Sequence, residues 1–313
     1  MASGNGRRAD AWTWDEALCG VVPPLISPLD STGQPDAAAM DALVSHVLAV
    51  GCTGLFVLGG CGEGAWLTAS QRGGIVRAAV RAAAGRVPVL AGVMLPSTGP
   101  VIDASRQAQD LGAAAVVVGS PYYFGVDGIA QRRHIEAVLE SVTLPALLYN
   151  IPQCTHETLD HRTVESLAAH PRVLGIKDSA GDFEAFQRLL AIKRQRPDFR
   201  VLQGNEALLA ASLLQGGDGL VPGLGNVAPA LMVALCRAAA RSDAAECARL
   251  QDEVTALCEI YGGEAHWLPS LKAACAALGL GNGVPAPPLV ALDDDGRARV
   301  SALARRHAGL VAR

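Results

Sequence analysis

VLGIKDSAGD, at residues 173–182, is the stretch on which the fold assignment depends. A short apolar run ends in Lys177, and polar and glycine residues follow it. The run does not alternate between apolar and polar residues, which is typical of a parallel β-strand covered on both faces. Lysine is seldom fully buried in proteins. A lysine at the end of such a strand therefore needs an explanation from the rest of the chain.

Seven further segments of the same kind occur along the chain, and amphipathic helical patterns separate them. The eight predicted strands are residues 20–26, 54–60, 88–94, 114–121, 145–152, 172–178, 200–205 and 218–224. Eight strands that alternate with helices indicate an α/β fold, a (β/α)8 TIM barrel. We expect an N-terminal tail over 1–16, the barrel over 17–225, and a closing helix with a C-terminal helical extension over 226–313.

An open, doubly wound sheet is the alternative architecture. It would require a glycine-rich nucleotide fingerprint, G-x-G-x-x-G, after its first strand. The segment GGCGEG at 59–64 has the wrong glycine spacing for this fingerprint. The barrel is therefore the favoured fold.

Composition excludes several classes of function. The net charge of the 313 residues is −4, which provides no basic footprint for nucleic acid. No stretch reaches the roughly 18 apolar residues of a membrane helix, and the N-terminus has no apolar signal core, so we expect a cytoplasmic protein. The eight cysteines form no C-x-x-C pair and the seven histidines no zinc motif. We expect reduced thiols and no metal.

The barrel suggests a role for Lys177. The chain has only three lysines; Lys193 lies among charged residues, and Lys272 is expected on a helix with its amine in solvent. Active sites of this fold lie at the C-terminal ends of the strands, where Lys177 would meet Tyr149 and Tyr123. Burial lowers the pKa of a lysine and frees a nucleophilic amine, and a phenol can carry protons to and from a carbonyl oxygen. This combination suggests imine chemistry.

Six motifs in this order and spacing are recognisable: GGCGEGAWLT, PVLAGV, GSPYY, LYNIP, GIKDSAGD and GNVAP. Together they resemble the dihydrodipicolinate synthase / N-acetylneuraminate lyase family over roughly residues 17–290. The resemblance implies a class I pyruvate aldolase, built as a TIM barrel with C-terminal helices and assembled as a homo-oligomer, a dimer or tetramer. It also implies that the substrate forms an imine with a lysine and that no cofactor is needed.

The resemblance assigns roles to individual residues. Lys177 matches the Schiff-base lysine, Tyr149 the tyrosine that relays protons, and Tyr123 a tyrosine that in many members reaches into the neighbouring subunit's site. Gly60 and Cys61 match two hydroxyl residues that hold the pyruvate carboxylate. A further match is Val221, whose backbone carbonyl would line the site.

Two departures from the family pattern bear on the substrate. Gly60 has no hydroxyl, and Cys61 is a weak donor in place of the second hydroxyl. Cys154 stands where dihydrodipicolinate synthases carry an arginine that grips the carboxylate of aspartate semialdehyde. A neutral or hydroxylated aldehyde is therefore the expected partner of the pyruvyl half. The candidate residues for the second substrate are Gln153, Cys154, Thr155, His156, Ser179, Asn205 and Glu206.

Three other functions remain open at this point. A 2-keto-3-deoxy-acid dehydratase would keep the same lysine and differ only in its product. A 4-hydroxy-tetrahydrodipicolinate synthase would have to work without the arginine. A ligand-binding barrel without catalysis is suggested by Gly60, but such a protein has no need of a lysine and two phenols together.

Overall fold

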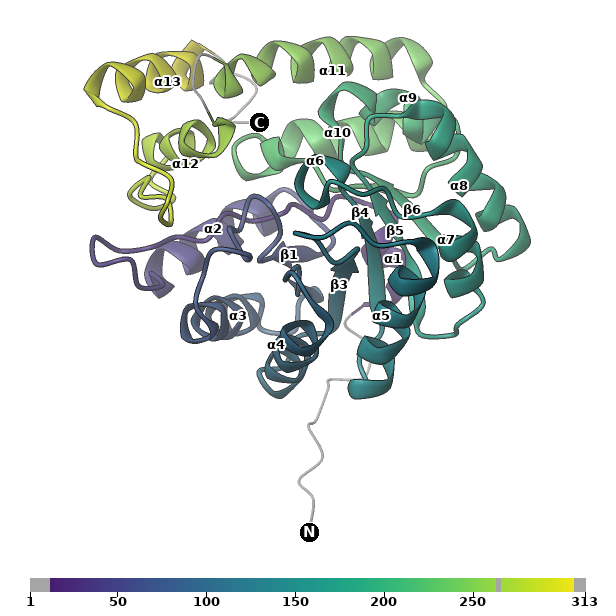
Figure 1. Ribbon diagram of the computed structural model, residues 1–313. Coiled ribbons are helices and arrows are strands. Elements are labelled where there is room, and N and C mark those ends of the chain that lie inside the picture. Colours follow the sequence, from purple (N-terminus) through teal and green to yellow (C-terminus); the bar gives the residue numbers. More distant parts are fainter. Residues whose placement is uncertain (1–11, 263–265, 307–313) are drawn as a thin grey trace.

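The structure is a computed structural model that describes residues 12–262 and 266–306. Its centre is a sheet of seven parallel strands, which pair in the order of the sequence. The strands are β1 Leu55–Val57, β2 Val89–Gly92, β3 Ala115–Gly119, β4 Ala146–Asn150, β5 Val173–Asp178, β6 Arg200–Gln203 and β7 Gly219–Leu220. Each lies inside a predicted strand, and the curled sheet with its surrounding helices confirms the α/β class (Figure 1).

The first predicted strand, residues 20–26, is wrong as a regular strand. Val21 forms one isolated parallel bridge with Leu220 of β7, and Pro24 forms another with Phe56 of β1. Pro23 and Pro24 explain the interruption, because proline has no N–H to donate and fixes φ. The segment still lies between the two edge strands, donating from Val22 to Leu220 and from Leu25 to Phe56.

Helices alternate with the strands and are mostly started by side-chain caps. Asp36 is an N-cap that accepts from the N–H groups of Ala38 and Ala39, and Thr68 forms a capping box with Gln71. The helices of this part are α1 Trp14–Leu18, α2 Ala37–Ala49, α3 Ala69–Ala83, α4 Thr98–Asp110, α5 Gly128–Ser141, α6 Pro152–Thr155, α7 His161–Ala168, α8 Phe183–Gln195, η1 Glu206–Leu208 and α9 Leu209–Leu214. Within the described ranges, no helix is long and apolar enough to cross a membrane.

A group of helices follows the last strand. They are η2 Gly223–Asn226, α10 Pro229–Ala240, α11 Ala244–Leu257, η3 Cys258–Tyr261, α12 Trp267–Ala277 and α13 Asp294–Arg306. Helix α10 packs against α11, and α12 against α13. The green and yellow helices α11, α12 and α13 gather at one end of the molecule (Figure 1).

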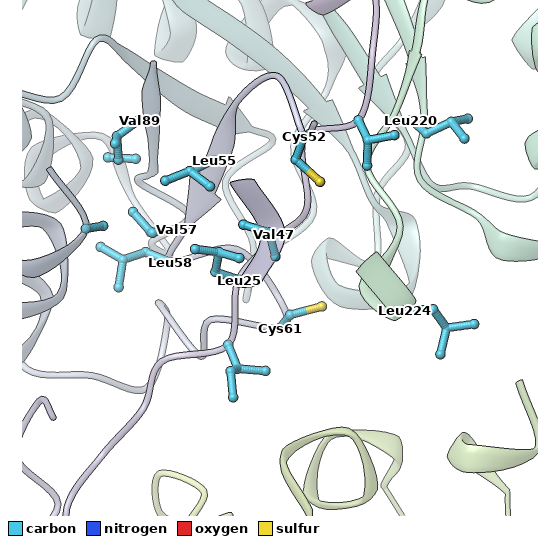
Figure 2. Packing of buried hydrophobic residues seen from close by; sticks show 14 of the residues in the cluster. Leu25, Val47, Cys52, Leu55, Val57, Leu58, Cys61, Val89, Leu220 and Leu224 are labelled. Carbon is cyan, nitrogen blue, oxygen red and sulfur yellow. The ribbon is translucent and has the colours of Figure 1, made fainter. Parts of the chain in front are cut away.

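Two apolar clusters cover the two faces of the sheet. The larger one joins the outer face to the helices; Figure 2 shows Val47 of α2 with Leu55 and Val57 of β1. The smaller one fills the inside of the curled sheet and contains Phe56 and Tyr149. Side chains alternate between the faces of a strand, and Lys177 is paired with Tyr149 in the β4–β5 register. The pairing directs the lysine to the inner face.

Candidate active site

Lys177 is buried at the C-terminal end of β5, with 3 % of its surface exposed. Its Nζ atom donates to the Tyr149 hydroxyl at 2.9 Å. The same atom lies 4.1 Å from the centre of the Tyr149 ring and 5.0 Å from that of Phe56. Burial lowers the pKa of Lys177 to about 8, so a useful fraction of the amine is unprotonated at neutral pH.

Tyr149 places its hydroxyl group next to the Lys177 amine. Burial raises the pKa of Tyr149 well above the ordinary value, and a hydrogen bond from Ser179 opposes that shift. Phe56 holds the ring in an edge-to-face contact with centroids 5.9 Å apart. The phenol therefore remains protonated at neutral pH and can act as a proton donor beside the lysine.

Gly204 has no side chain, and the Lys177 and Ser179 side chains occupy the space next to it. A Cβ atom at this position would lie 2.6 Å from Lys177 Cε and would also overlap the Ser179 hydroxyl. Any larger residue at the end of β6 would displace the amine. Ser179, one of the residues considered for the second substrate, thus lies directly beside the lysine and Tyr149.

The loop after β1 presents Gly60 and Cys61. Cys61 is buried, and burial raises the pKa of its thiol to about 12, although the nearby Lys177 opposes the shift. A Cβ atom at Gly60 would meet nothing within 4 Å. The loop therefore offers open space beside Gly60, and the Cys61 thiol is not a nucleophile at neutral pH.

The GGCGE loop is held by a contact with the C-terminal helices that the sequence does not reveal. Lys272 of α12 is buried and donates to Glu63 Oε2 at 2.6 Å and to the Ser27 carbonyl at 2.9 Å. The second carboxylate oxygen of Glu63 accepts from the N–H of Ala286 at 2.5 Å. The expectation that the Lys272 amine lies in solvent is therefore wrong, because Glu63 and a carbonyl replace its hydration.

Glu206 and Tyr261 complete this end of the sheet. Glu206 Oε1 accepts from the Tyr261 hydroxyl at 3.2 Å and from the Gly223 N–H at 2.8 Å. Tyr261 is the fourth tyrosine of the chain, and sequence reasoning missed it because it lies in the C-terminal helices. The chain has only four tyrosines, and the other three are predicted at this end of the sheet. This rarity is the sequence signal that points to Tyr261.

The remaining expected residues lie farther from the amine or face elsewhere. Val221 is buried in the inner cluster, and Cys154 is exposed. Gln153 donates to the carbonyls of Ser179 and Ala180, and Thr155 bonds the backbone of its own loop. Asn205 caps η1 through the N–H of Ala207.

His156 and Tyr123 are not brought to Lys177 within this chain. His156 lines a cavity of about 440 Å³ together with Asp178 of β5 and Leu189 of α8, on the outer side of the sheet. Tyr123 is 83 % exposed, has φ = 86°, and contacts Phe124 edge to face. Among the described residues, no group of three or more His, Cys, Asp or Glu side chains could hold a metal ion.

Relatives of the chain have this architecture. The sequence profile of the Dihydrodipicolinate synthetase family matches residues 17–307. The chain is 34 % identical over 288 residues to a 4-hydroxy-tetrahydrodipicolinate synthase of Laribacter hongkongensis (strain HLHK9), covering 91 % of this chain and 97 % of the relative. It is 33 % identical over 287 residues to the putative 2-dehydro-3-deoxy-D-gluconate aldolase YagE of Escherichia coli (strain K12), covering 91 % and 95 %.

Solved structures agree with these relatives. The structure of YagE in complex with pyruvate superposes with a TM-score of 0.87 at 32 % identity, covering 92 % of this chain and 97 % of that chain. The dihydrodipicolinate synthase of Bacteroides thetaiotaomicron superposes with a TM-score of 0.88 at 33 % identity, covering 92 % and 98 %. The chain belongs to the dihydrodipicolinate synthetase family and is a lyase of that family.

Proposed function

We propose that the protein is a Schiff-base-forming lyase, a class I aldolase that acts on pyruvate or a 2-keto-3-deoxy acid. The observation that carries the proposal is the buried amine of Lys177, 2.9 Å from the Tyr149 hydroxyl. With a pKa of about 8, roughly one-tenth of the amine is unprotonated at pH 7, against fewer than about one in a thousand for an ordinary lysine. This gain makes the amine a nucleophile at neutral pH.

The reaction begins when the neutral amine attacks C2 of the 2-oxo acid. The attack leaves an oxyanion and a positively charged nitrogen. The nitrogen passes one proton to this oxygen and Tyr149 donates the second, so the oxygen leaves as water and a protonated imine remains on Lys177, with Tyr149 as the phenolate. The imine accepts the electron pair of the C3–C4 bond as the substrate's C4 hydroxyl loses its proton to Tyr149. An aldehyde departs and a neutral enamine is left, which is protonated and hydrolysed to pyruvate and free amine. Every step reverses for condensation.

Backbone N–H groups of the loop at Gly60 and Cys61 are proposed to hold the carboxylate of the 2-oxo acid. Ser179 supports proton transfer, since its hydroxyl bonds to Tyr149. Gly204, directly after β6, and Val221, directly after β7, border the same space. No metal or organic cofactor has a role in this scheme.

The aldehyde half is proposed to be neutral or hydroxylated. No arginine or lysine occurs between Asn150 and Leu159, and Cys154 stands at the family's arginine position. The Glu206 carboxylate adds negative charge to this end of the sheet. An anionic aldehyde would lose solvation without gaining a cationic partner, at a cost of several kcal/mol.

Comparison of kcat/KM tests the choice of aldehyde. Aspartate semialdehyde should be used far less well than neutral aldehydes such as glycolaldehyde or glyceraldehyde, and Cys154→Arg should improve its use. Efficient condensation with aspartate semialdehyde, on the order of 10⁴ M⁻¹s⁻¹ or above, would instead favour a 4-hydroxy-tetrahydrodipicolinate synthase, the name that the Laribacter relative carries. Product analysis with a 2-keto-3-deoxy acid separates the aldolase from a dehydratase.

The assembly is proposed to be a homo-oligomer, with the sheet closed into a barrel by residues 20–25. Tyr123 and Phe124 are 83 % and 77 % exposed, and such aromatic pairs favour a protein partner. A second copy that covers them would bring Tyr123 toward the partner's site. Light scattering should give a dimer or tetramer; a monomer would remove Tyr123 from the proposed reaction.

Reductive trapping tests the imine itself. Incubation with pyruvate and borohydride should add one reduced pyruvyl group to the protein, and peptide mapping should locate it on Lys177. Lys177→Met is the matched variant and should take no label, whereas Lys193→Met should label normally. A label on Lys193 or Lys272, or no label, would contradict the imine mechanism and favour a ligand-binding barrel.

A further inference from the structure

Glu206 is the first residue of η1, which follows β6 after Gly204 and Asn205, and β6 is paired with the strand that carries Lys177. Its Oε1 atom accepts from the N–H groups of Gly223 at 2.8 Å and Leu224 at 3.3 Å, in addition to the Tyr261 hydroxyl. Its backbone carbonyl accepts from Gln251 of α11. The carboxylate is therefore fixed in place by several donors from the C-terminal part of the chain.

Gly223 brings this carboxylate next to Cys61. A Cβ atom at Gly223 would lie 2.7 Å from the Tyr261 hydroxyl, 3.2 Å from Glu206 Oε1 and 3.3 Å from Cys61 Sγ. All three groups thus surround one backbone position. Tyr261 reaches it from η3 and is supported by an edge-to-face contact with Trp267, with centroids 5.7 Å apart.

Four titratable groups lie near Lys177: Tyr149 of β4, which accepts from its amine, Cys61 in the loop after β1, Cys154 of α6, and Glu206 of η1. Burial raises the pKa of both thiols and of the phenol, so these three groups are neutral at pH 7. Within the described chain, Glu206 is the one carboxylate whose charge raises the pKa of Lys177, against the lowering effect of burial.

We propose that Glu206 is the fixed counter-charge of the Lys177 imine, a positioning residue held by Tyr261 and by two backbone amides. The proposal rests on the proposed function. An imine nitrogen is less basic than the amine it replaces, and only the protonated imine accepts the electron pair of the breaking C3–C4 bond. In a buried site the proton would be lost near neutral pH unless a negative charge lay close by. Glu206 supplies that charge without touching the reacting atoms.

Glu206→Gln tests the charge with little change in shape, since its amide oxygen can still accept from Gly223. Both the free amine and the imine should lose their protons at lower pH in this variant. The bell-shaped pH profile of turnover should therefore move about one pH unit toward acid, the interaction expected for unit charges several Å apart in a medium of intermediate dielectric constant. At pH 8 turnover should fall roughly tenfold.

Tyr261→Phe is the matched control, because it removes a hydrogen bond to the Glu206 carboxylate and keeps its charge. Its pH profile should stay within roughly 0.3 pH unit of the wild type. A second measurement is single-turnover trapping of pyruvate with cyanoborohydride from about pH 5.5 to 9.5, with the labelled fraction of protein measured by mass spectrometry. The pH dependence of this fraction should shift toward acid by the same amount for Glu206→Gln and should not shift for Tyr261→Phe.

Two results would overturn the counter-charge. In the first, the pH profile of turnover of Glu206→Gln coincides with that of the wild type. In the second, the pH profile of Tyr261→Phe shifts as far as that of Glu206→Gln, which would mean that altered packing, and not the loss of charge, causes the shift. In both cases the wild type still traps pyruvate on Lys177. A wild-type protein that fails to trap pyruvate at all would refute the proposed function instead, so the two failures are distinguishable.

Discussion

Lys177→Met should make the protein more stable at neutral pH while abolishing turnover. Burial holds the pKa of Lys177 at about 8 in the folded state, against 10.5 for an ordinary lysine. Each pKa unit corresponds to about 1.4 kcal/mol, so the charged lysine lowers the free energy of unfolding by about 3 kcal/mol below pH 8. Loss of the hydrogen bond to Tyr149 costs about 1 kcal/mol. The net gain at pH 7 is about 2 kcal/mol.

The sign of the pH dependence follows from proton binding. Between pH 8 and 10.5 the unfolded chain binds the proton and the folded protein does not, so wild-type stability rises with pH across this window. The penalty of about 3 kcal/mol at pH 7 should fall to about 1 kcal/mol at pH 10. The advantage of Lys177→Met should therefore shrink over this range.

Thermal and urea unfolding at pH 7 and pH 10 measure the effect. We expect Lys177→Met to melt roughly 3–6 °C above the wild type at pH 7, and the difference to vanish at pH 10. Lys193→Met is the control, since Lys193 is ion-paired with Asp218 at 2.7 Å and its loss should give no gain at either pH. A Lys177→Met protein that is less stable than the wild type at pH 7, or equally stabilised at both pH values, would refute the reasoning.

Three further substitutions test other parts of the site. Tyr149→Phe should keep the fold and pyruvate trapping but lower turnover in steady-state kinetics by roughly 10²–10⁴, the scale of acid–base catalysis; unchanged turnover would exclude the phenol from the mechanism. Gly60→Thr should change the melting temperature little, because a Cβ there meets nothing within 4 Å; a large loss would mean that the space is not open. Lys272→Met should lower the free energy of unfolding by about 3–5 kcal/mol, because it leaves the Glu63 charge buried without its partner. Adding Glu63→Gln should recover most of this loss in urea unfolding, and equal stability of the single and double variants would contradict the ion pair.

The pattern of apolar residues predicts the alternation of strands and helices and places Lys177 at the end of a strand. Continuous apolar runs predict parallel strands because both faces of such strands are covered, and seven of the eight were found. The predicted strand that did not form is the first one, residues 20–26, which contains Pro23 and Pro24. Proline has no N–H to donate to the hydrogen-bond ladder, so only isolated bridges form at Val21 and Pro24.

Which polar groups come into contact depends on how the helices and strands pack against one another. Lys272 and Glu63 are 209 residues apart, and the Tyr261–Glu206 contact spans 55 residues. A periodic pattern records which face of an element is apolar, but it carries no information on which distant side chain a buried charge will find. Lys272 has the sequence context of a surface residue, yet the packing of α12 buries it against the GGCGE loop. The same packing brings Tyr261 to Glu206, because burying the apolar faces of the C-terminal helices fixes where their few polar side chains come to lie.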